Sequence, residues 1–130
     1  MITEDYCSYD VAKLLKDKGF YQDFLNATIP VWKLNGSREE LAFYGDDNYP
    51  CEWEEWYSAP THQMAMKWLR EVHNLCIAPY AAAYRYGFTI DKADIGSNLG
   101  NEIKFYPEEE FETYENAVEA ALKYCLENLI

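Results

Sequence analysis

The side chains best suited to nucleophilic chemistry are His73 and Cys76, which lie three positions apart. On one face of a helix this spacing brings two side chains together, so the pair has the minimum composition of a thiolate with its general base. Cys76, however, falls on the apolar stripe of the helix predicted here, and no carboxylate is placed by its spacing to orient the imidazole. Buried cysteines of this kind are ordinary core residues. The sequence therefore predicts no catalytic residue, and an enzyme is the weaker interpretation.

Residues that could hold a metal or a cofactor are also poorly spaced. The two histidines, His62 and His73, are eleven positions apart, and two imidazoles at that spacing do not make a site. The four cysteines are separated by 44, 25 and 49 positions, far from the spacing of about two to four residues that zinc and thioredoxin-like sites use. The chain has no phosphate-cradling glycine loop, no nucleophile elbow and no metalloprotease helix motif. We therefore expect neither a metal nor a cofactor.

The amino-terminal stretch MITEDYCSYD is acidic and contains no apolar run of the kind that a signal peptide needs. An even number of cysteines permits two disulfides, but without a secretory signal a reduced, cytoplasmic protein is the better interpretation. No run approaches the roughly 18 apolar residues of a membrane span. The sequence thus predicts a soluble protein without a membrane partner.

The charge of the chain limits its partners. Eleven basic residues against 23 acidic ones give a net charge of −12. Because phosphate groups repel an acidic surface, ordinary binding to nucleic acid or to anionic membranes is disfavoured. The acids gather in two stretches without Lys or Arg: seven carboxylates between Arg38 and Lys67, and six between Lys104 and Lys123. Solvated loops and an acid-rich first helical turn explain such stretches; the alternative is a cation-binding or DNA-mimicking face.

Candidate binding residues lie in NYPCEWEEWYSAP at 48–60, a stretch without any basic group. A helix there would place the two tryptophans on one face, whereas a strand would point them to opposite faces. In either case at least one large ring needs cover, which packing against the sheet or the following helix would supply. An exposed ring with an acidic rim would instead suit a basic or aromatic partner surface, where Trp and Tyr are common hot spots. Both alternatives stay open for the candidate partner-binding residues, which are Trp53, Glu54, Glu55, Trp56 and Tyr57.

Three amphipathic segments predict helices that would position these residues. The first, in SYDVAKLLKDKGF, follows an N-cap at Ser8 and stops at Gly19. The second lies in SAPTHQMAMKWLREVHNL, where Ser58 or Thr61 can cap the start. The third, YENAVEAALKYCLENLI, follows an N-cap at Thr113. The predicted apolar stripe of the second helix consists of Ala65, Trp68, Leu69, Val72 and Cys76.

Strands are predicted between the helices. TIPVWKL and ELAFYG carry β-branched and aromatic residues, and the Asn-Gly of the intervening NGSRE is a hairpin signal. Pro30 cannot donate to a ladder, which favours an edge position for the first of these strands. A second β region comprises LCIAPY and AYRYGFTI, in which Tyr84, Tyr86 and Phe88 alternate with other residue types, and EIKFY adds a short last strand.

Hairpin-linked strands and segregated helices predict an α+β fold, because a parallel sheet would need a crossover helix between its strands. The expected architecture is an antiparallel sheet of four to five strands with three helices packed mainly on one face, in the order α-ββ-α-ββ(β)-α. A chain of 130 residues fits one domain, so residues 1–130 are predicted to fold together.

Three blocks of the chain, SYDVAKLLKDKGF, SAPTHQMAMKWLRE and TYENAVEAALKYCLENLI, occur in this order and cover about a third of it. In these blocks the chain resembles a family of small uncharacterised proteins common in phages and prophages of gut bacteria. The block from Ala-Pro-Thr to Trp-Leu-Arg-Glu is the most specific of the three. The resemblance implies a phage or prophage context and no mechanism, so no catalytic residue follows from it.

Two classes of function remain open from the sequence. The first is a non-enzymatic interaction protein, for example a phage accessory factor, that binds a protein partner through an acidic, aromatic surface. Its sharper form is an inhibitor that mimics the charge of DNA, which requires carboxylates along one face and competition by salt or duplex DNA. The second class is a small enzyme or ligand-binding domain, which requires a deep pocket with converging polar groups.

Overall fold

The structure is a computed structural model of the 130-residue chain. The chain divides into two compact units, Met1–Thr61 and His62–Ile130. Folding of residues 1–130 as one domain stays a prediction. Side chains are described for residues 2, 4–20, 59–92 and 107–130, and the backbone alone for residues 27–33, 38–43, 56–58 and 102–105.

The helix of the first unit, α1 (Tyr9–Asp17), confirms the first helical prediction. The Ser8 hydroxyl accepts a hydrogen bond from the Val11 N–H at 3.3 Å, which satisfies one of the free donors at the start of the helix. Val11 and Leu15 are 1% exposed, so the apolar face of the helix is buried. Gly19 follows the helix with a φ of 86°, a left-handed conformation that glycine adopts at no steric cost.

The strands of the first unit are β1 (Ala27–Lys33), β2 (Arg38–Phe43) and β3 (Trp56–Ser58), in the order β2-β1-β3. The predicted hairpin of β1 and β2 is confirmed, with Ile29 opposite Leu41 in antiparallel register. The edge position predicted for β1 is wrong, because β3 pairs with its other side. Pro30 is tolerated there because β3 pairs only with Val31–Lys33 and leaves Pro30 outside that ladder.

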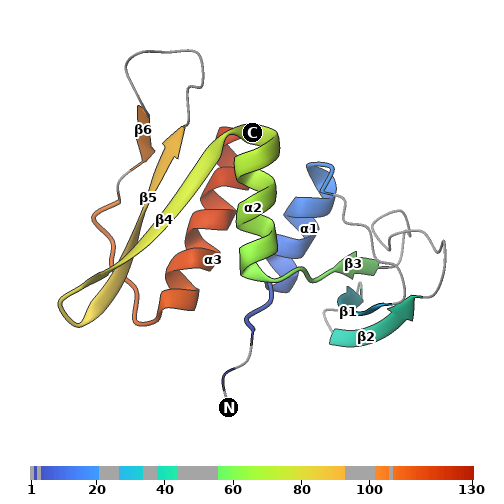
Figure 1. The fold of residues 1–130 in the computed structure, drawn as a ribbon. Helices are drawn as coiled ribbons and strands as arrows, with labels where there is room; N and C mark the ends of the chain where they lie inside the picture. The colour runs from blue at the N-terminus through green and yellow to red at the C-terminus, as the bar shows by residue number, and fades with distance from the viewer. Residues whose placement is uncertain are drawn as a thin grey trace. The chain divides into compact units, whose positions relative to one another are not determined.

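In the second unit three strands lie between two helices along the chain, in the order α2, β4, β5, β6, α3 (Figure 1). Its three strands form one antiparallel sheet in the order β4-β5-β6. The chain ends in a π-helical turn at Cys125–Leu129, directly after α3. The bounds are α2 (His62–His73), β4 (Leu75–Ala82), β5 (Arg85–Lys92), β6 (Glu102–Phe105) and α3 (Tyr114–Tyr124).

The buried face of α2 differs from the predicted apolar stripe. Val72 is 57% exposed and Trp68 is half-buried, so neither anchors the helix. Cys76 does not belong to the helix at all, because Asn74 takes a positive φ of 57° and the chain continues as β4. The residues of α2 that are buried are His62, Ala65, Met66 and Leu69.

Both helices of the second unit contact the sheet, α2 through β4 and α3 through β4 and β5. Figure 1 shows both helices on the same side of the β4–β5 hairpin. Phe88 and Ile90 of β5 are buried on the helical side. Thr113 caps α3 as predicted, since its hydroxyl accepts a hydrogen bond from the Asn116 N–H at 3.0 Å. The fully buried residues of α3 and the turn after it are Ala117, Val118, Ala121, Leu122, Cys125 and Leu126.

The α+β class predicted from the sequence is confirmed, with three α-helices and antiparallel strands among the described residues. The strands that the structure describes form two sheets of three, one in each unit, so a single sheet of four to five strands is not shown among them. The predicted order lacks the short strand Trp56–Ser58, because the sequence assigns Ser58 to the start of the second helix. Among the helices that the structure describes, none is long and apolar enough to span a membrane.

Candidate interaction surface

The candidate partner-binding residues of the sequence lie mostly outside the described part of the chain. Nothing is described for Trp53, Glu54 and Glu55, and for Trp56 and Tyr57 only the backbone is described, in β3. There Tyr57 pairs with Trp32, and Trp56 pairs with Lys33. The exposure of the two tryptophan rings, on which that hypothesis depends, thus stays a prediction.

An aromatic surface with acidic residues beside it is described in the second unit, at the tip of the β4–β5 hairpin. Ala82 and Arg85 are the last paired residues, so Ala83 and Tyr84 form a two-residue turn. Tyr84 is 99% exposed, the highest exposure of any large hydrophobic side chain described in this unit. The turn therefore presents a full aromatic ring to solvent.

The segment that precedes α3 is fixed against this hairpin by its main chain. The Tyr86 N–H donates to the Phe111 carbonyl at 2.9 Å, and the Phe111 N–H donates to the Tyr86 carbonyl at 2.7 Å. The ring of Phe111 stacks on Phe88 with centroids 5.9 Å apart, and Tyr86 meets Tyr114 edge to face at 6.2 Å. These contacts hold the segment in one position beside β5.

The opposite side of the hairpin is also closely packed. Gly87 is buried, and a Cβ atom at this position would lie 2.7 Å from the ring of Tyr80. Only glycine lets the Tyr80 ring lie this close to β5. The hairpin is therefore held by aromatic rings on both of its faces, since Gly87 and Phe88 point to opposite sides.

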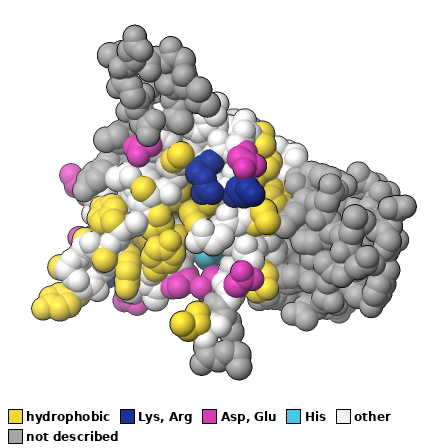
Figure 2. All heavy atoms as spheres, in the orientation of Figure 1, with side chains coloured by type: hydrophobic (Ala, Val, Ile, Leu, Met, Phe, Trp, Pro, Cys, Tyr) yellow, Lys and Arg dark blue, Asp and Glu magenta, His cyan; other side chains and the backbone are white. Residues whose placement is uncertain are grey.

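Exposed carboxylates flank Phe111 along the fixed segment. Because the Tyr86–Phe111 bridge is antiparallel, the chain after Phe111, beginning with Glu112, runs toward the end of β5 that carries the turn. Figure 2 shows hydrophobic side chains, a class that includes Tyr, gathered over the hairpin with Asp and Glu side chains at their border. We define the hairpin surface as Tyr84, Tyr86 and Tyr114 together with the exposed Glu108, Glu109, Glu110 and Glu112.

The turn of the hairpin carries strain that can be measured. Ala83 has a φ of 52°, and a single positive φ at the first turn position is typical of type II′ turns, which favour glycine there. An Ala83→Gly variant should be more stable by about 0.5–1 kcal/mol, because glycine removes the Cβ clash at the cost of some chain entropy. Urea unfolding measures this difference. The control is Ala82→Gly in the adjacent strand, which should lower the stability, and a loss in both variants would contradict the turn geometry.

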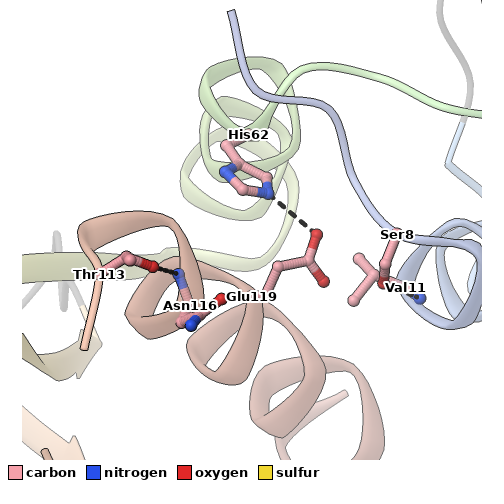
Figure 3. A network of polar contacts seen from close by, with 6 residues as sticks. All are labelled: Ser8, Val11, His62, Thr113, Asn116 and Glu119. Atoms are coloured by element: carbon pink, nitrogen blue, oxygen red, sulfur yellow. Dashed lines mark hydrogen bonds and ion pairs between the residues drawn. The ribbon is translucent and has the colours of Figure 1, made fainter. Parts of the chain in front are cut away.

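A hydrogen bond between a buried histidine and a partly buried glutamate joins the two helices of the second unit. His62 at the start of α2 is 6% exposed, and its Nε2 lies 2.9 Å from Oε1 of Glu119 in α3 (Figure 3). The imidazole is therefore anchored at one nitrogen, which gives the pair a structural role between α2 and α3.

Removal of Glu119 tests this role. A Glu119→Ala variant should lose about 1–3 kcal/mol of unfolding free energy, because it leaves the buried His62 nitrogen without this acceptor. Glu119→Gln keeps an acceptor oxygen and should lose less than Glu119→Ala. Urea unfolding of the two variants gives the comparison, and equal losses would show that the hydrogen bond contributes nothing.

The structure does not bring His73 and Cys76 together as a catalytic pair. His73 ends α2 with its ring edge to face with Trp68 at 4.7 Å, whereas Cys76 lies in β4 opposite Asp91. Among the described contacts, no hydrogen bond or ion pair joins the imidazole to the thiol, and His73 Nε2 is buried without a hydrogen-bond partner. The other cysteine of this unit, Cys125, is a poor nucleophile because burial raises the pKa of its thiol to about 12.

Two features of the sequence belong to the hairpin surface, although neither of them predicts it. The six carboxylates between Lys104 and Lys123 include the four of this surface, and Tyr84 belongs to the aromatic alternation of AYRYGFTI. The alternation predicts Tyr84 within a strand, whereas the chain turns at Ala83 and Tyr84 without any glycine, asparagine or proline.

Comparisons with protein-family models, with curated proteins and with solved structures give no match for this chain. The resemblance to phage and prophage proteins therefore stays a prediction. The function has to be inferred from the surface described above.

Proposed function

We propose that this chain is a non-enzymatic interaction protein that binds a protein partner through an acidic, aromatic surface, as a phage or prophage accessory factor would. One observation carries the proposal: the Tyr84 ring, 99% exposed at the tip of the β4–β5 hairpin, belongs to the hairpin with which the exposed acidic segment pairs at Phe111. Tyr is frequent among the residues that dominate binding energy at interfaces. Glutamates beside it would select the partner by charge.

The way in which the surface is held supports this function. The acidic segment is attached to β5 by two main-chain hydrogen bonds and a stacked pair of phenylalanine rings. A surface that is already ordered loses less conformational entropy when a partner binds. In the second unit α2 and α3 both contact the sheet of β4, β5 and β6, and packing of the helices mainly on one face would leave the other face of this sheet open to a partner. The stretch with Trp53 and Trp56 is proposed as a second part of the same interaction function.

Affinity capture with variants tests the proposal. Wild-type protein, Tyr84→Ala and a variant with Glu108, Glu109, Glu110 and Glu112 changed to Gln are immobilised, and bacterial proteins that they retain are quantified by mass spectrometry. We expect a protein that wild type retains and both variants lose. A captured set that is the same for all three would contradict the role of the hairpin surface. Trp53→Ala and Trp56→Ala, run in parallel, test the second stretch in the same way.

Addition of duplex DNA to the capture separates the two forms of this function. Duplex DNA competes for any basic partner, so a partner that depends on the aromatic ring is recognised by its loss in Tyr84→Ala, whether or not DNA displaces it. A partner that is displaced by DNA, and that Tyr84→Ala still retains, would favour the DNA-mimicking alternative.

A further inference from the structure

The aromatic part of the hairpin surface has a local charge that limits what it can bind. Around Phe111 the exposed residues Glu108, Glu109, Glu110 and Glu112 carry four carboxylates, and no Lys or Arg occurs between Lys104 and Lys123. The exposed Arg85, the residue after Tyr84, can offset one of them. The border of the aromatic rings thus keeps an excess of negative charge, which attracts a cationic group and repels an anionic one.

From this surface we infer that the occupant is a basic segment of another protein whose contact residue is arginine, with its guanidinium stacked on the exposed ring of Tyr84 and paired with the neighbouring glutamates. The inference rests on the proposed function and names the class of partner. A guanidinium is planar, so it can lie flat on an aromatic ring and still donate hydrogen bonds to carboxylates at its edge. A lysine ammonium is a strongly hydrated point charge and makes only one of these contacts well.

Charge also excludes the other occupants of such a surface. A second copy of this chain would bring another net charge of −12 against the same carboxylates. Nucleic acid would bring phosphates, which are repelled in the same way. A basic segment is the occupant that complements both the rings and their border.

Peptide binding measures the preference directly. The probes are a fluorescent arginine-rich Gly/Ser peptide, a twin with lysine for every arginine, and a twin with citrulline, which keeps the planar group and removes the charge. Fluorescence anisotropy gives their Kd values at low and at physiological ionic strength. We expect the arginine peptide to bind about two- to fivefold more tightly than the lysine peptide, and the citrulline peptide to bind most weakly.

Variants assign the two contributions to their residues. Tyr84→Ala should reduce the preference for the arginine peptide over the lysine peptide, because the stacking contact is lost while the paired hydrogen bonds of the guanidinium with carboxylates remain. The four-glutamine variant of the hairpin surface should weaken both by about fivefold or more. Its matched control changes four exposed acids elsewhere to amides, at Glu4, Asp17, Glu71 and Glu127, and so has the same net charge. Circular dichroism shows that each variant is folded.

Three results would overturn the inference: equal affinity for the arginine and lysine peptides, an arginine preference of unchanged size in Tyr84→Ala, or equal losses in the two four-residue variants. If the peptides fail to bind but a captured bacterial protein is still lost in both hairpin variants, the proposed function stands and the arginine inference is wrong. If neither peptides nor bacterial proteins depend on these residues, both are wrong.

Discussion

A Leu69→Ala variant should be less stable than wild type by about 2–5 kcal/mol, whereas Val72→Ala, three residues further along the same helix, should stay within about 0.5 kcal/mol of it. Leu69 is 0% exposed and Val72 is 57% exposed. Truncation of Leu69 therefore leaves a cavity in a packed core, and truncation of Val72 leaves only solvent. Urea unfolding followed by circular dichroism gives both values.

The two variants also distinguish the buried side of α2 in the structure from the apolar side that the sequence pattern predicts. The predicted apolar stripe contains both residues and requires both variants to be strongly destabilised. In the structure the buried side of α2 includes His62 and Met66. Of the two residues compared here, only Leu69 lies on that side. A loss of similar size in Val72→Ala would show that the orientation of α2 is wrong.

The second large effect is a loss of stability at alkaline pH that depends on Cys125. Burial raises the pKa of this thiol from its ordinary value of 9.0 to about 12, because the thiolate would be desolvated. Between these two values the unfolded chain releases the proton and the folded chain keeps it. The unfolded state then binds fewer protons, so the unfolding free energy falls as the pH rises, by about 1.4 kcal/mol per pH unit from this group. This contribution is fully present below pH 9 and is lost as the pH rises toward 12.

The measurement is urea unfolding at several pH values from neutral to about 10.5, for wild type and for Cys125→Ala. All other groups are the same in both proteins, so their effects cancel in the difference between the two curves. We expect a steeper alkaline loss in wild type than in Cys125→Ala. Leu126→Val serves as the control, because it removes a methylene group from the same buried turn and keeps the thiol, so its loss should be as steep as that of wild type. Parallel curves for wild type and Cys125→Ala would show that the thiol is accessible to water.

The sequence alone predicts the helix ends that depend on a single capping residue. Ser8 and Thr113 cap their helices through hydroxyl contacts that span three residues, and Gly19 ends α1 with a positive φ. These features depend on neighbours in the chain, so the order of residues is enough to predict them. The α+β class follows for the same reason, because turns and apolar periods are local.

Features that depend on distant parts of the chain were not predicted. The helix α2 ends before Asn74, which has a φ of 57°, and β4 begins at the next residue. The sequence pattern instead predicts that the helix continues to Cys76. The hairpin surface forms because Phe111 pairs with Tyr86, which lies 25 positions earlier, and no local pattern predicts this pairing. The candidate residues Trp53 to Tyr57 were chosen by composition, which reports residue types and says nothing of their exposure.

The attachment of the acidic segment to β5 has a consequence for how this surface can change. The two hydrogen bonds of Phe111 with Tyr86 come from main-chain atoms, which every residue type except proline can supply. The glutamates on either side of Phe111 can therefore be replaced without loss of these bonds. Substitution of all four by lysine should therefore reverse the charge of this segment and leave its attachment to β5 intact. The fold thus allows the charge of this surface to change at a few exposed positions, while the core that stabilises it stays the same.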